Sequence, residues 1–103
     1  MYAVIFRAEI AVLDDDYAQM ADRMRDLAID QYGCREFIAC TEGSCEVAIS
    51  YWDSESQIKA WKSNSEHLSA QRKGRSQWYK SYTVQVVEVV REYSSQASQG
   101  PLR

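Results

Sequence analysis

The chain has 103 residues, enough for one compact domain with a single hydrophobic core. It carries 12 basic and 15 acidic side chains, a formal net charge of −3, without any basic block. This balance argues against a nucleic-acid partner, because phosphate binding needs clustered lysine and arginine. No run of 18 apolar residues is present, so the sequence predicts no membrane partner and a cytoplasmic location.

The N-terminal segment 2–10 alternates in hydrophobicity as a strand does, and residues 14–31 then change to the helical period. Three aspartates stand directly before the apolar stripe of this helix. They fit an N-cap and first-turn acids better than a metal cluster, because such acids complement the helix dipole. Gly33 follows the helix as a stop signal.

Residues 34–53 predict two strands joined by a turn in the sequence TEGS. If the outer two residues of TEGS close the turn, Cys40 lies opposite Cys45 and within reach of a disulfide. Two reduced cysteines are the favoured interpretation for a cytosolic chain. The third cysteine, Cys34, completes a spacing of C-x5-C-x4-C that does not match a zinc site, so no metal is predicted.

The next segment, 53–65, predicts a helix that begins with a capping box formed by Ser54 and Gln57. Asn64 interrupts it, and a second helix is predicted over 66–79. The second helical region is therefore expected to be split in two.

A valine-rich final strand is predicted over 81–93, and the polar tail 94–103 is expected to lie outside a domain that spans 1–93. The order β-α-β-β-α-β predicts an α+β, ferredoxin-like fold with a four-stranded antiparallel sheet and helices on one face. The other face of this sheet also carries apolar residues. We therefore expect a homodimer in which two sheets pack face to face.

Residues 2–93 resemble the antibiotic biosynthesis monooxygenase family. The resemblance is carried by a strand ending in Tyr51-Trp52, by Ala60-Trp61, His67, Ala70-Gln71 and Gly74, and by a last strand ending in Arg91-Glu92-Tyr93. It implies a dimeric α/β barrel. Some members of this family oxygenate phenols or quinols without metal, flavin or heme, and others bind heme and degrade it.

The heme-degrading members combine an Asn on the first strand with a Trp and an iron-ligating His ten residues later. Trp61 is present here, but Gln71 stands ten residues after it and His67 only six. The first strand contains no Asn. The resemblance therefore favours a protein without a cofactor, and heme remains the alternative.

A cofactor-free oxygenase needs an apolar slot for an aromatic ligand, a base, and donors for developing negative charge. His67, with Gln71 on the same helix face, is the candidate base, because the start of a helix favours neutral imidazole. A structural or solvent-facing role for His67 is preferred over the role of a base. The candidate slot residues are Trp52, Trp61, Trp78, Phe6 and Phe37, and the candidate donors are Arg7, Tyr51 and Tyr79.

These candidates also have structural interpretations. The aromatic side chains fit a packed core, and Arg7 can pair with Glu9 or with an acid on a neighbouring strand. The sequence thus leaves three hypotheses open: an oxygenase of the cofactor-free kind, a heme-binding enzyme, and a non-catalytic dimer that binds a small aromatic molecule.

Overall fold

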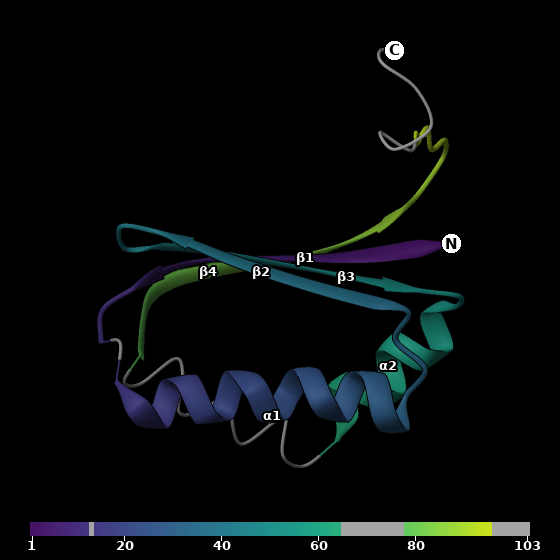
Figure 1. Ribbon diagram of the computed structural model, residues 1–103. Coiled ribbons are helices and arrows are strands. Elements are labelled where there is room, and N and C mark those ends of the chain that lie inside the picture. The colour runs from purple at the N-terminus through teal and green to yellow at the C-terminus, as the bar shows by residue number, and fades with distance from the viewer. Residues whose placement is uncertain (13, 65–77, 96–103) are drawn as a thin grey trace.

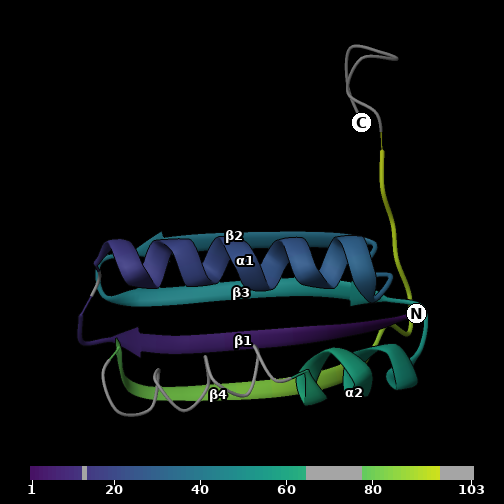
Figure 2. The ribbon, with the colours of Figure 1, turned by 90° about the horizontal axis from the view of Figure 1, so that it is seen from below.

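The computed structural model describes residues 1–12, 14–64 and 78–95. Its strands form one antiparallel sheet in the order β2-β3-β1-β4. Both helices lie on the same face of this sheet (Figure 1), with α1 along β2 and β3 and α2 toward β4 (Figure 2). The elements are β1 (Tyr2–Ile10), α1 (Asp15–Gln31), β2 (Glu36–Glu42), β3 (Cys45–Trp52), α2 (Glu55–Ser63) and β4 (Tyr79–Glu88).

The predicted α+β, ferredoxin-like architecture is confirmed by this element order and sheet topology. The predicted second half of the split helix falls almost entirely on residues 65–77, which lie outside the described part of the chain. No helix in the described residues is both long and apolar enough to span a membrane.

The helix ends are fixed by the capping signals that the sequence shows. The Asp14 side chain accepts a hydrogen bond from the Tyr17 backbone N–H at 2.8 Å, and Ser54 and Gln57 form both bonds of a capping box. Gly33 has a φ of +80° just after α1. A Cβ at this position would lie 2.6 Å from the Gln57 side-chain nitrogen, so glycine also lets the end of α1 approach the start of α2.

The hairpin between β2 and β3 has a different register from the predicted one. Glu42 pairs with Cys45, and Cys40 faces Val47. The predicted opposition of Cys40 and Cys45 is therefore wrong, and both thiols are free. The physical reason is Gly43, whose φ of +60° suits the first position of a two-residue loop. The change shifts the pairing by two residues, so each side chain stays on its predicted face.

The last strand also differs from the prediction over 81–93. It begins earlier, at Tyr79, which was expected in a helix but pairs with Ile10 after an irregularity in the ladder. It ends at Glu88, which pairs with Tyr2 at the start of β1, and one more backbone hydrogen bond follows, from the Val89 N–H to the Met1 carbonyl oxygen at 2.9 Å. Residues 89–95 leave the sheet on the side opposite the helices (Figure 1).

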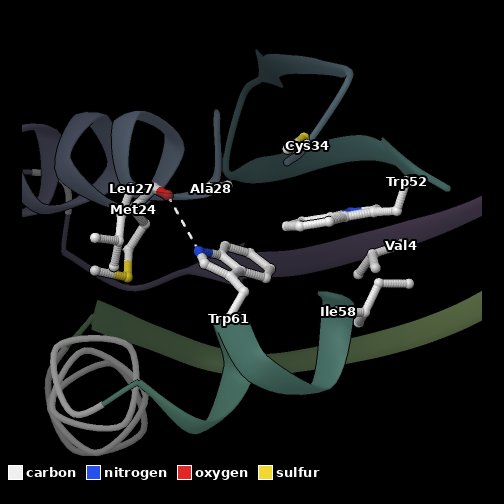
Figure 3. Close-up of a cluster of buried hydrophobic side chains, with 8 residues drawn as sticks. All are labelled: Val4, Met24, Leu27, Ala28, Cys34, Trp52, Ile58 and Trp61. Carbon is white, nitrogen blue, oxygen red and sulfur yellow. Dashed lines mark hydrogen bonds between the residues drawn. The ribbon is translucent and has the colours of Figure 1, made fainter. Parts of the chain in front are cut away.

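Two buried clusters join α1 to the sheet. The first, which we call the Trp52–Trp61 cluster, lies under the C-terminal half of α1 (Figure 3). In it the indole N–H of Trp61 donates to the Met24 carbonyl oxygen at 3.3 Å, and that of Trp52 donates to the Ser50 hydroxyl at 2.9 Å. The Trp78 cluster lies under the N-terminal end of α1. The first cluster comprises Val4, Met24, Leu27, Ala28, Cys34, Trp52, Ile58 and Trp61, and the second Ile10, Tyr17 and Trp78.

We expect Ser54→Ala to lower the free energy of unfolding by about 1 kcal/mol, because it removes the N-cap of α2. Urea unfolding followed by circular dichroism measures this loss. Ser63→Ala, at an exposed position in the last turn of the same helix, is the matched control and should leave stability nearly unchanged. Equal effects of the two substitutions would contradict a capping role.

Candidate active site

A cavity of about 160 Å³ lies between α1 and the helix-facing side of the sheet. Its walls come from both helices and from all four strands. The lining residues are Val4, Phe6, Tyr17, Met20, Ala21, Asp22, Met24, Arg25, Phe37, Ala39, Glu46, Ala48, Trp61, Lys62, Tyr79, Tyr82 and Val84.

The cavity exists because small side chains stand between the two aromatic clusters. Ala39 and Ala48 pair across β2 and β3, and Phe6 follows next to Ala48 on β1. Ala21 lines the cavity from α1, between Tyr17 of one cluster and Met24 of the other. Larger side chains at both ends support the helix, and the alanines below its middle do not reach it.

Aromatic rings form much of the cavity wall. Phe6 lies 5.4 Å from Tyr79 and 5.9 Å from Tyr82, measured between ring centroids. Tyr17 meets Tyr79 edge to face at 5.8 Å. At the other end, Trp61 packs against Phe37 at 6.4 Å. Such rings offer faces and edges against which a flat aromatic ligand can pack.

Glu46 brings a carboxylate into this apolar surrounding. It lies on the helix-facing side of β3, next to Ala8 on β1, which in turn faces Tyr82 on β4. The Glu46 residue is only 8% exposed, and its Oε2 has no hydrogen-bond partner in the structure described. Burial raises the pKa of the Glu46 carboxyl, because the charged form loses its hydration.

The same environment affects Tyr79. Burial raises the pKa of the Tyr79 phenol well above its usual value, and the neighbouring Glu46 carboxylate and Tyr82 add smaller electrostatic contributions in the same direction. Tyr79 therefore keeps its proton at neutral pH and can act as a hydrogen-bond donor.

Charged side chains stand at the rim of the cavity. Arg25 lies 3.7 Å from Asp22, and Lys62 approaches from α2. The Arg25 and Asp22 side chains are 46% and 70% exposed, so this pair contributes little to stability. The rim thus carries charged side chains of both signs, whereas the interior is apolar apart from Glu46 and the tyrosine hydroxyls.

The structure brings together only part of the site predicted from sequence. Phe6, Phe37, Trp61 and Tyr79 line the cavity. The predicted base His67 and its neighbour Gln71 lie outside the described residues. The others are not lining residues: Trp52 and Trp78 are buried in the two clusters, and Arg7 and Tyr51 lie on the open face of the sheet.

Among the lining residues that sequence reasoning missed, Glu46, Tyr17 and Tyr82 carry polar groups that bear on the chemistry. A signal for Glu46 was available, because alternation along β3 puts it on the same face as Ala48 and Trp52. A charged residue on a buried strand face is unusual and marks a functional candidate. The two tyrosines carried no such signal, since tyrosine is common in helix stripes and strands.

The described cavity does not fit a heme group. An engineered apolar cavity of about 150 Å³ holds one benzene ring, and a heme macrocycle has four pyrrole rings. No group of three or more His, Cys, Asp or Glu side chains suited to a metal occurs in the described residues.

Comparison with solved structures identifies the fold. A variant of SnoaB, a cofactor-independent oxygenase from Streptomyces nogalater, superposes with a TM-score of 0.77 over 91% of this chain and 97% of that one, at 11% identity. A putative antibiotic biosynthesis monooxygenase from Nitrosomonas europaea gives 0.70 over 88% and 100%, at 12% identity. The fold is thus that of the antibiotic biosynthesis monooxygenases, and the resemblance seen in the sequence is confirmed at this level.

A sequence relative places the chain within a family. It is 41% identical over 92 residues to the uncharacterized protein YqjZ of Bacillus subtilis (strain 168), covering 88% of this chain and 81% of the relative. The chain belongs to the same family as YqjZ. No family model matches it.

We expect Glu46→Gln to stabilise the protein, and more so as pH rises. The folded state holds the Glu46 proton more tightly than the unfolded state, so the charged form costs stability. This cost is absent below the unfolded pKa of about 4.3. It grows as pH rises, and it is complete above the folded pKa.

Thermal unfolding at several pH values measures this effect. The melting temperature of Glu46→Gln should match that of the parent near pH 4 and exceed it by several degrees at neutral pH. Glu88→Gln, an exposed glutamate of β4, is the control and should show no such trend. A difference that stays constant with pH would contradict an electrostatic cause.

Proposed function

We propose that this protein is a small oxygenase that acts with O2 on a hydroxylated aromatic molecule and needs no bound cofactor. The observation that carries the proposal is the cavity of about 160 Å³ with aromatic walls and a buried carboxylate. SnoaB, named as a cofactor-independent oxygenase, has the same fold and supports this choice of chemistry.

In such a reaction the ligand itself supplies the electrons. A phenol or quinol loses a proton, and its electron-rich anion reduces O2. The protein must exclude water, hold the ring, and provide donors for developing oxyanions. Trp61 and Phe37 offer a wall for the ring, and the hydroxyl of Tyr79 is a donor at the Glu46 end.

We further propose that the protein is a homodimer joined through the open sheet face. The residues that point away from the helices include a cross-strand row of Ile38, Ile49 and Ile5. Ile38 is 44% exposed, although it lies in a strand. An apolar sheet face of this kind is self-complementary when two copies pack about a twofold axis.

The segment after β4 supports the same arrangement. Residues 89–95 run away from the sheet on its open side (Figure 1), and Val90 and Tyr93 are 85% and 83% exposed. Apolar side chains this exposed suit contact with a second copy.

Oxygen uptake with a panel of quinols and phenols tests the proposed activity. The parent protein should consume O2 above a heat-killed control and incorporate label from isotopic O2 into the product. Ala48→Leu should abolish uptake, because it fills the cavity from the floor, yet it should not lower the melting temperature, because space is available.

Ala18→Leu is the matched control on the exposed face of α1 and should retain activity. Binding of a panel compound that is recovered unchanged, with no uptake for any compound, would favour the alternative of a non-catalytic binding protein. Uptake unaffected by Ala48→Leu would show that the reaction occurs elsewhere.

Sedimentation tests the dimer. The parent should sediment as a dimer, and Ile49→Glu should sediment as a monomer, because two carboxylates would be buried at the centre of the interface. Ile29→Glu places the same charge at an exposed site on α1 and should remain dimeric. A monomeric parent would contradict the proposal directly.

A further inference from the structure

The Glu46 carboxyl is an unsatisfied group in an otherwise well-paired interior. On the same strand face, Ser50 is also buried, but its hydroxyl receives the Trp52 N–H at 2.9 Å. The residue Glu46 lines the cavity, and its Oε2 is buried with no hydrogen-bond partner in the described residues. A buried acceptor without a donor costs free energy, and a ligand that brings a donor recovers it.

We propose that Glu46 is the proton acceptor of this site, and that its carboxylate receives the proton of an acidic ring hydroxyl on a one-ring aromatic ligand. The inference rests on the proposed function, since it names the ligand class and the base for the same cavity. The expected ligand is a phenol whose ring fills the apolar volume and whose hydroxyl points to Glu46.

The size and polarity of the cavity select this class. A volume of about 160 Å³ is close to that of a cavity known to take one benzene ring. A ring over Ala39 and Ala48 would be flanked by Phe6, Phe37 and Trp61. A pure hydrocarbon would leave Glu46 unpaired, and a ligand carboxylate there would be repelled by it.

A ligand ammonium group is less suited than a hydroxyl. It would have to lose its hydration in an apolar interior. A neutral hydroxyl loses much less hydration on entering the same interior.

The proposed step is a proton transfer without electron exchange. The ligand O–H bond breaks, a new O–H bond forms on Glu46, the electron pair stays on the ligand oxygen, and the carboxyl becomes neutral. Burial favours this direction, because it raises the proton affinity of the carboxylate. The titratable and charged groups that share the cavity with Glu46 are Tyr79 and Tyr82 from β4, Tyr17, Asp22 and Arg25 from α1, and Lys62 from α2.

Fluorine NMR titrations with para-fluorophenol and para-fluoroanisole test the inference, because the ether has a methyl group in place of the hydroxyl proton and cannot donate it. At neutral pH the parent protein should bind the phenol about tenfold or more tightly than its methyl ether. This preference should shrink as pH falls through the Glu46 pKa, where the carboxylate is lost.

Glu46→Gln should reduce the preference and remove its pH dependence, whereas Glu88→Gln should change neither. The comparison of the two probes on the parent protein needs no variant, so it holds even if Glu46→Gln folds poorly. Equal binding of both probes would overturn the role of Glu46 and leave the proposed cavity function standing.

A preference that survives unchanged in Glu46→Gln would also overturn it and would direct attention to another base such as His67. Failure of both probes to bind the parent would overturn this inference together with the choice of the cavity as the ligand site.

Discussion

The structure depends on the way α1 is held away from the sheet. Its two ends rest on aromatic clusters, in which Trp52 and Trp61 lie 5.3 Å apart and Tyr17 and Trp78 lie 5.5 Å apart, centroid to centroid. A helix supported at two places cannot collapse onto the alanines between them without bending. Protein interiors are normally packed to crystal density, so a cavity in a domain of 103 residues reflects this geometry.

The cavity explains why a carboxylate, Glu46, occupies a buried position on a strand. A carboxylate on a buried strand face works against stability, and nothing in the surrounding packing requires it. Its neighbour on the same face, Ser50, is satisfied by Trp52, which shows that the strand can accommodate a paired polar group. Groups that break a local rule without a compensating contact tend to mark functional positions. Glu46 meets this description better than any residue that the sequence pattern singled out in the described part of the chain.

Most of the fold was predictable because its signals are local. Alternation in β1, the stripe of α1 and the two N-caps each depend on a few neighbouring residues, and each is confirmed. The boundaries of β4 and the register of the hairpin were not predicted correctly. The boundaries of β4 are set by the length of β1, a strand that is distant in sequence. The hairpin register depends on Gly43, which allows the turn to be closed by either of two residue pairs.

The site was less predictable than the fold for a similar reason. Whether a buried aromatic residue is core or cavity wall depends on the size of the side chains opposite it. Trp52 is enclosed by the first cluster, whereas Phe6 lies next to Ala48 and borders open space. No pattern in the sequence around these two residues distinguishes them, because the deciding neighbours lie on other strands.

The alternation of the strands separates the two proposed roles of the sheet. Ala48 and Glu46 face the helices and the cavity, while Ile49 and Tyr51, farther along the same strand, face the open side. Substitutions on one face can therefore change ligand binding without changing subunit contact, and the reverse also holds. Proteins that share this fold at 11–12% identity can keep the sheet and replace the cavity residues. Fold likeness alone does not determine a ligand. Under the proposed function, the ligand is selected by the side chains on the helix-facing side, of which Glu46 is the most distinctive.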